Sequence, residues 1–202
     1  ILSLDYGIET IYGIKYGYRG LVAEHDLTPI LLNNDEVDTI HNLGGTILGA
    51  SRGQQDTKKI VETLMRMNIN LLFCIGGDGS LRAARDITAE CKTRGLAISV
   101  VGIPKTVDND LMFIDRSFGF ETAVQRAKEA IAAVHMEAAS QINGVGLVKL
   151  MGREAGFIAT QAALASHETN FCLIPEVPFE LEGENGFLAC LERRLAKRGH
   201  AV

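Results

Sequence analysis

Two aspartates in the segment PKTVDND, residues 104–110, have the types and the spacing that a proton-transfer site needs. Asp108 and Asp110 lie two positions apart, and Lys105 lies five positions before Asp110. In such a group one carboxylate can accept a proton from a substrate hydroxyl while the other shapes the local field or binds a metal. Phosphoryl transfer to an alcohol needs such a base together with cations that neutralise charge. The alternative interpretation is an Asx-rich surface turn.

A glycine-rich turn follows five apolar residues in the segment LLFCIGGDGS, residues 71–80. Its glycines let backbone N–H groups approach a ligand, and a helix that begins at Ser80 directs its positive dipole end to the same place. Both features favour a phosphate. Asp78 would repel that phosphate unless a cation lies between them, so its expected role is to hold Mg2+, directly or through water. The alternative is a plain glycine turn in which Asp78 caps the helix.

Three further charged residues lie in loops that could bind a phosphate or a sugar. Arg153, in KLMGREAGF, precedes an expected helix, where its guanidinium can form two hydrogen bonds to a phosphate or sugar oxygen. Glu176, between the two prolines of IPEVPF, is a rigidly held acceptor that suits a sugar hydroxyl. Arg52, at the end of GGTILGASRG, is a second candidate phosphate-binding residue. Each of the three could equally be an ordinary surface residue.

Apolar runs that alternate with amphipathic stretches predict the elements that position these residues. The apolar runs lack polar alternation and are separated by helices, which is typical of a parallel sheet covered on both faces. We therefore predict an α/β fold, a three-layer sandwich of Rossmann type around a mainly parallel sheet. Charged residues follow four consecutive strands, so one edge of the sheet should carry the site. Expected strands are 11–15, 71–75, 96–103, 144–150 and 170–174, and expected helices are 37–43, 54–67, 80–93, 117–140, 155–166 and 185–198.

Composition excludes several classes of function. The net charge of −5 over 202 residues gives no electrostatic reason to expect nucleic acid or an anionic membrane surface as a partner, and no apolar run is long enough to span a membrane. The four cysteines include no C-x-x-C pair, so we predict free thiols in a cytoplasmic protein rather than a zinc site or disulfides. The five histidines lack metal or triad spacing, and the Walker pattern is absent.

Six motifs occur in the order found in the 6-phosphofructokinases, and together they span nearly the whole chain. They are GGTILGASR, GGDGS, PKTVDND, SFGFETAV, KLMGREAGF and IPEVPF. The resemblance implies transfer of a phosphoryl group, with Mg2+, to the 1-hydroxyl of fructose 6-phosphate. It implies that Asp108 is the catalytic base and Asp78 the Mg2+ aspartate, with Lys105, Thr106 and Asp110 beside the base and the transferred phosphate.

The same resemblance assigns donor and acceptor contacts. On the donor side it implies that Tyr18, Arg52, Gly77, Asp78, Gly79 and Ser80 bind the phosphates of ATP. On the acceptor side it implies that Thr106, Asp108, Met151, Arg153 and Glu176 bind fructose 6-phosphate, with Gly152 allowing the backbone to approach it.

Two positions favour different phosphoryl donors. Bacterial ATP-dependent members of the family have glycine at the position of Lys105, whereas pyrophosphate-dependent members have lysine there. The pyrophosphate-dependent members typically have aspartate at the position of Gly79, where the carboxylate excludes the α-phosphate of a nucleotide. Lys105 is compatible with either donor, so Gly79 decides for ATP. This pairing resembles the ATP-dependent enzymes of plants and trypanosomatids, which belong to the pyrophosphate-type lineage. Pyrophosphate remains the alternative donor.

A further departure concerns the rest of the acceptor site. Gly144 stands where the bacterial enzymes have an arginine that reaches the sugar phosphate of a neighbouring subunit.

We expect residues 1–202 to be a phosphofructokinase-like catalytic region from which the upstream first glycine loop and most of a second domain are missing. By itself this region should be inactive. The family forms homo-oligomers, so a tetramer or dimer is expected.

Two other classes of protein remain as alternatives. A non-catalytic regulatory subunit with the same fold would be expected to lose Asp108 or the glycines of the metal loop, and all of these residues are present. Diacylglycerol and NAD kinases share the GGDG loop, but they lack PKTVDND followed by KLMGR and PEVPF.

Overall fold

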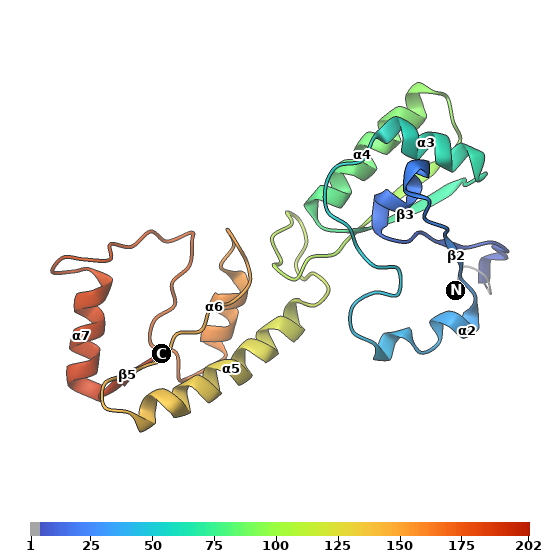
Figure 1. Cartoon of the computed structure of the whole chain (residues 1–202). Coiled ribbons are helices and arrows are strands. Elements are labelled where there is room, and N and C mark those ends of the chain that lie inside the picture. Colours follow the sequence, from blue (N-terminus) through green and yellow to red (C-terminus); the bar gives the residue numbers. More distant parts are fainter. Residues whose placement is uncertain (1–4) are drawn as a thin grey trace. The chain divides into compact units, whose positions relative to one another are not determined.

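The structure is a computed structural model that describes residues 5–202. The chain divides into two compact units. The first consists of the residues up to Ile75 together with Gly79–Ile103, and the second consists of Gly76–Asp78 together with Pro104–Val202. Figure 1 shows the course of the chain through the elements of each unit.

The central elements of the first unit are two neighbouring strands, β3 (Leu71–Gly76) and β4 (Ser99–Pro104). Ser99 N donates to Asn70 O at 2.9 Å where β4 begins, and Lys105 N donates to Gly76 O at 2.8 Å where it ends. The partner positions advance together along both strands, so the strands are parallel. Two helices accompany this pair, α3 (Thr57–Arg66) and α4 (Asp78–Thr93).

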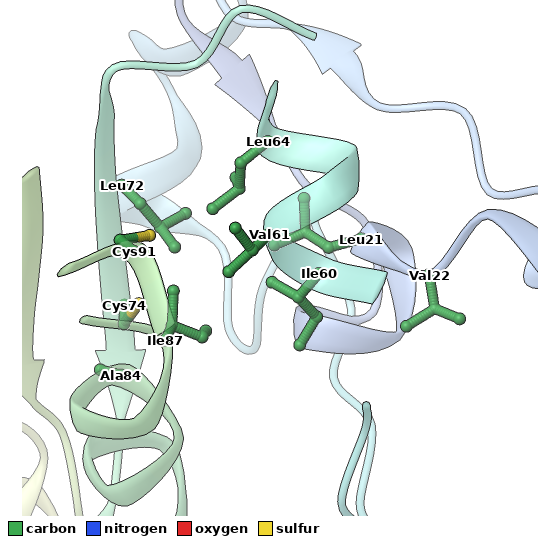
Figure 2. Close-up of a cluster of buried hydrophobic side chains, with 10 residues drawn as sticks. All are labelled: Leu21, Val22, Ile60, Val61, Leu64, Leu72, Cys74, Ala84, Ile87 and Cys91. Atoms are coloured by element: carbon green, nitrogen blue, oxygen red, sulfur yellow. The ribbon is translucent and has the colours of Figure 1, made fainter. Parts of the chain in front are cut away.

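One apolar core joins these elements. In Figure 2, Val61 and Leu64 of α3 point toward Leu72 of β3 and Cys91 of α4. Each of these four side chains is at most 8% exposed. The helix α3 begins where Asp56 accepts a hydrogen bond from Lys58 N at 2.8 Å, an N-cap that fixes its start and directs its apolar face to the strands.

The second unit is built around two helices, α5 (Phe120–Ser140) and α6 (Phe157–Leu164). Phe120, Val124 and Ile131 of α5 pack against Ile158 and Ala162 of α6, as their adjacent positions in Figure 1 suggest. The chain then continues through α7 (Phe187–Arg198).

A short parallel pair completes the second unit. Strand β5 (Gly144–Val145) pairs with β6 (His200–Ala201), with Gly144 opposite His200.

The short elements of the first unit are β1 (Tyr12–Gly13) and β2 (Ile30–Leu31), which form an antiparallel pair, α2 (Asn34–Val37), and the 3-10 helices Gly17–Leu21, Ala23–His25 and Ile40–Asn42.

The α/β class and the predominance of parallel pairing are confirmed, but the strands form three separate pairs within the described residues. The last expected strand, 170–174, is not a strand. Asn170 N and Phe171 N both donate to Val202 O, yet Val202 N donates to the Asn170 side chain, at 3.1 Å. A side-chain oxygen thus takes the place of a backbone partner, so no regular ladder forms.

Several helix boundaries differ from those expected, because local caps decide them. The expected helix 37–43 is replaced by α2, which begins earlier because Asn33 caps it by accepting from Glu36 N, and by a separate 3-10 turn. The helix expected from Ser117 begins at Phe120 instead, since Gly119 has a left-handed backbone, with φ 90°, through which an α-helix cannot continue. The helix expected from Ser80 begins two residues earlier, at Asp78.

Within the first unit, the two helices cover one face of the strand pair. Along β3, Leu72 and Cys74 are buried, whereas Phe73 and Ile75 are 40% and 62% exposed. Val101 of β4 is 41% exposed as well. Both α3 and α4 pack against the face that carries Leu72 and Cys74. The strand is apolar on both faces, but the helices of this unit cover one of them.

None of the helices in the described part of the chain is long and apolar enough to cross a membrane.

Candidate active site

The ends of β3 and β4 bring two of the predicted motifs side by side. The hydrogen bond from Lys105 N to Gly76 O extends the strand pairing by one step beyond β4. A Cβ added to Gly77 would lie 3.5 Å from Lys105 O, so the glycine turn and the start of the segment 104–110 are in van der Waals contact. These residues all belong to the second unit. The predicted convergence of these two strand ends is confirmed.

The glycine turn leads directly into α4. Asp78 is the first residue of this helix, and Gly79 and Ser80 follow in its first turn. The N–H groups of a first helical turn have no partner within the helix, so they can donate to an anion. A Cβ at Gly79 would meet nothing within 4 Å, and its φ is not positive, so neither strain nor crowding explains a glycine at this position.

The two aspartates of the segment 104–110 are tied together by Thr106. Thr106 Oγ1 donates to Asp110 Oδ1 and accepts from Asp108 N, both at 3.2 Å. Asp108 is 9% exposed, and its Oδ1 is buried with no hydrogen-bond partner in the described part of the chain. A buried carboxylate oxygen without a partner is costly, and such atoms are found where a ligand or catalytic proton completes them.

Lys105 lies at the exposed edge of this group. Within residues 5–202 its ammonium forms neither an ion pair nor a hydrogen bond. It therefore offers a positive charge to a bound anion without first breaking an internal contact. This leaves the cation and the buried Asp108 carboxylate three positions apart on the same loop.

The segment 151–156 forms a tight turn before α6. Gly152 has φ +135°, and a Cβ there would lie 2.2 Å from Ala155 O, so only glycine fits. Arg153 follows at φ 48°, in the left-handed region that is uncommon for an arginine, and Met151 is 68% exposed. The exposed Arg153 has no ion pair among the described residues, so its guanidinium is available to a ligand.

Glu176 lies at the start of the same helix. Its Oε1 accepts a hydrogen bond from Gly156 N at 2.7 Å, next to the first residue of α6. The carboxylate therefore satisfies an N–H group at a helix N-terminus, where negative charge is favoured. The prolines on either side hold it there. One of its two oxygens is engaged in structure, a role that the sequence did not indicate.

Tyr18, predicted to bind the donor, forms a hydrogen bond with the first turn of α4 within the first unit. Its hydroxyl donates to Ser80 O, in the first turn of α4, at 2.7 Å. Burial, followed by the neighbouring Cys74 thiol, raises the pKa of Tyr18 well above its ordinary value. The hydroxyl therefore stays a donor at neutral pH and holds the first turn of α4.

Arg52 lies in a loop that is anchored on the segment before Tyr18. Ser51 Oγ donates to Tyr16 O at 2.6 Å, and Tyr16 N donates to Leu48 O at 2.7 Å. Arg52 itself is exposed, and its side chain has no partner in the described residues. The short segment 16–18 thus forms hydrogen bonds both to the loop that carries Arg52 and, through Tyr18, to Ser80.

The predicted site residues fall into groups by unit. Tyr18, Arg52, Gly79 and Ser80 belong to the first unit, and Gly77, Asp78, Lys105, Thr106, Asp108, Asp110, Met151, Gly152, Arg153 and Glu176 belong to the second. Within the second unit, hydrogen bonds join the residues of 104–110 to one another and Glu176 to Gly156.

The predicted Mg2+ site consists of one protein ligand, Asp78, with further ligands supplied by a substrate. Among the described residues, no three His, Cys, Asp or Glu side chains lie close enough to hold a metal ion together. Mg2+ typically binds through one or two carboxylates together with waters and substrate phosphates. An aspartate at the first position of α4, beside a cluster of free helix N–H groups, fits such a shared site.

Sequence reasoning missed the role of Asn109, between the two aspartates. Its Nδ2 donates to Asp115 O at 3.2 Å and its Oδ1 accepts from Ser117 N at 2.8 Å. The available signal was the residue type, because asparagine is several-fold enriched in the left-handed conformation that it adopts here.

The structure also explains Gly144, where a Cβ would lie 2.1 Å from Ala138 O. A side chain does not fit at that position.

The chain belongs to the phosphofructokinase family, whose model matches residues 2–202. It is 57% identical, over 96% of its length, to an ATP-dependent 6-phosphofructokinase of Borreliella burgdorferi, and 52% identical over its whole length to ATP-dependent 6-phosphofructokinase 7 of Arabidopsis thaliana. Trypanosome relatives with the name ATP-dependent 6-phosphofructokinase also match. The predicted resemblance to plant and trypanosomatid members is confirmed.

A solved structure supports the fold. The pyrophosphate-dependent phosphofructokinase of Marinobacter aquaeolei is 27% identical and superposes with a TM-score of 0.79 over 96% of this chain and 51% of its own. This chain covers 43% of the Borreliella relative and 41% of the Arabidopsis relative. It thus spans less than half the length of these curated relatives.

Replacing Tyr18 with phenylalanine tests the contact that fixes the first turn of α4. We expect the free energy of unfolding to fall by about 1 kcal/mol, the usual net value of one hydrogen bond. Because the pKa of Tyr18 is raised above its ordinary 10.0, this contribution is complete below pH 10 and is lost as the pH rises further. Urea denaturation of both proteins, at neutral pH and above pH 10, measures the difference.

Tyr12→Phe is the matched control. Tyr12 is 42% exposed, and its hydroxyl has no hydrogen bond in the described part of the chain. We expect no change in stability for this variant. Equal losses from Tyr18→Phe and Tyr12→Phe would contradict the assignment of the Ser80 contact.

Proposed function

We propose that this chain is the catalytic region of an ATP-dependent 6-phosphofructokinase, which transfers the γ-phosphoryl group of ATP to the 1-hydroxyl of fructose 6-phosphate and yields fructose 1,6-bisphosphate. The observation that carries the proposal is the buried Asp108 Oδ1, which has no hydrogen-bond partner among residues 5–202, in a loop where Lys105 also forms no ion pair with these residues. The names of the relatives at 57% and 52% identity support the same activity.

In the proposed mechanism Asp108 accepts the proton of the 1-hydroxyl while that oxygen attacks the γ-phosphorus and ADP leaves. Phosphoryl transfer requires positioning and charge neutralisation more than covalent chemistry. Thr106 holds Asp108 and Asp110 in one arrangement, and Lys105 offsets the charge on the transferred group. Mg2+, for which Asp78 is the proposed protein ligand, would supply further positive charge to the phosphate oxygens when it is bound with the donor.

The acceptor, fructose 6-phosphate, is proposed to bind to residues of the segment 151–156 and to Glu176, all in the second unit. The Arg153 guanidinium is suited to form two hydrogen bonds to the 6-phosphate, and Gly152 allows the backbone to come close to the sugar. Glu176 keeps one oxygen for a sugar hydroxyl while the other caps α6. Met151 provides an exposed apolar contact. Homo-oligomer formation and a cytoplasmic location remain predictions.

Pyrophosphate is the second candidate donor. Two observations favour it, namely Lys105 and the likeness to the pyrophosphate-dependent enzyme of Marinobacter aquaeolei. Gly79 argues against it, because the open space around this position leaves room for a nucleotide beyond the transferred phosphate. A non-catalytic regulatory subunit is disfavoured because Asp108, Asp78 and the glycine turn are all retained.

Asp108→Asn, in the full-length enzyme, tests the proposed base. The substitution keeps size and hydrogen-bonding geometry but removes the proton acceptor. We expect kcat to fall by about 100-fold or more, within the usual range for loss of a general base, while both substrates still bind. Steady-state kinetics and isothermal titration calorimetry with fructose 6-phosphate measure the two quantities.

The matched control for that experiment is Asp115→Asn. Asp115 lies in the same loop and is exposed, and its carboxylate has no partner among residues 5–202. Its kcat should stay within about twofold of the wild type, since surface substitutions have small effects. An Asp108→Asn enzyme with wild-type turnover would refute the proposed role.

Gly79→Asp tests the donor. The backbone and surroundings of Gly79 accept a side chain without strain, so the variant should fold normally. We expect kcat/KM for ATP to fall by about tenfold or more, because like charges a few ångströms apart repel by ~1 kcal/mol or more near a protein surface. Gly79→Asn, with the same volume and no charge, separates repulsion from bulk. Unchanged ATP kinetics in Gly79→Asp would refute the exclusion argument.

A further inference from the structure

Asn109 closes the loop that carries the proposed base. Its backbone is left-handed, with φ 57°, and both polar atoms of its side chain are used. Nδ2 reaches forward six residues to Asp115 O, and Oδ1 reaches forward eight residues to Ser117 N. One side chain thus joins the segment 104–110 to the residues immediately before α5, which begins at Phe120.

The residue beside Asn109 needs such support. Asp108 is nearly buried, and its Oδ1 has no partner in the described residues, so nothing bonded to that oxygen holds the carboxylate in place. Thr106 holds the backbone on one side by accepting from Asp108 N. On the other side the hydrogen bonds come from the Asn109 side chain. Loss of these bonds would let an unsatisfied carboxylate rotate toward solvent, where its charge is better hydrated.

Asparagine is suited to this position for two reasons. It adopts the left-handed conformation more readily than other residues that carry a side chain. Its amide also provides one donor and one acceptor, which match the carbonyl of Asp115 and the N–H of Ser117. Aspartate would keep only the acceptor, and glycine would keep only the backbone conformation.

We propose that Asn109 is a positioning residue for phosphoryl transfer, and this rests on the proposed function of Asp108. It holds the loop 109–117 closed, and thereby keeps the Asp108 carboxylate directed at the acceptor hydroxyl. Asn109 binds neither substrate. It acts on the chemical step and has little influence on the affinity for fructose 6-phosphate or ATP.

The test compares Asn109→Gly with Asn143→Gly in the full-length enzyme. Asn143 is also left-handed, with φ 54°, but it is exposed in the turn between α5 and β5 and its side chain has no hydrogen bond in the described part of the chain. We expect Asn109→Gly to lower kcat by about 10- to 100-fold with both KM values within about threefold, since small misplacement of a catalytic group slows chemistry by such factors. Asn143→Gly should match the wild type.

Rescue by a conservative variant separates positioning from general stability. Asn109→Asp retains the acceptor for Ser117 N, so its kcat should lie between those of the wild type and Asn109→Gly. A role in stability alone predicts that activity follows the folded fraction. Circular dichroism at the assay temperature measures that fraction. Wild-type kcat in folded Asn109→Gly, or a change confined to KM, would overturn the proposal.

Amide hydrogen exchange gives a readout that does not depend on activity. The Ser117 amide is protected by Asn109 Oδ1, so its exchange should be faster by about tenfold or more in Asn109→Gly and unchanged in Asn143→Gly. If the wild type phosphorylates no sugar phosphate, the proposed function fails, and faster Ser117 exchange then still demonstrates that Asn109 closes the loop. Unchanged exchange at Ser117 overturns the role of Asn109 itself.

Discussion

The hydrogen bond from Lys105 N to Gly76 O is the interaction on which the candidate site depends. It carries the pairing of β3 and β4 one step past the strand end and so keeps the glycine turn in contact with the segment 104–110. Because the strands are parallel, both turns leave the sheet at the same edge. The glycine turn at Gly76–Asp78 and the segment 104–110, about thirty residues apart in the sequence, are thereby held together within the second unit.

Beyond that edge, the arrangement of Asp108 depends on short-range hydrogen bonds. Thr106 binds the backbone of Asp108 and the carboxylate of Asp110, and Asn109 binds the chain that leads into α5. In the described part of the chain these contacts leave one Asp108 oxygen buried without a hydrogen-bond partner, an arrangement that is costly in isolation and suits the proposed role of Asp108 as a proton acceptor. The loop is therefore less stable than it would be if this carboxylate oxygen had a hydrogen-bond partner.

The sequence predicted strands at 71–75 and 96–103, close to β3 (71–76) and β4 (99–104), and the helices that follow them, because continuous apolar runs and amphipathic periodicity are strong signals. It also predicted that the turn after β3 and the segment after β4 lie together. It did not predict the start of α2, which depends on the Asn33 cap, or the contact of the Asn170 side chain with Val202 that takes the place of a strand ladder. Nor did it reveal that Tyr18 and Glu176 use polar atoms to hold helix starts, since a contact to a backbone atom leaves no pattern in the sequence.

The most direct test of the proposed activity is to supply the full-length wild-type enzyme with fructose 6-phosphate, Mg2+ and either ATP or pyrophosphate, and to measure formation of fructose 1,6-bisphosphate. The account predicts product with ATP and little or none with pyrophosphate, because Gly79 leaves room for a nucleotide and Asp108 is free to accept the proton of the hydroxyl. Product with pyrophosphate alone would contradict the assignment of the donor. No product with either donor would contradict the proposed activity.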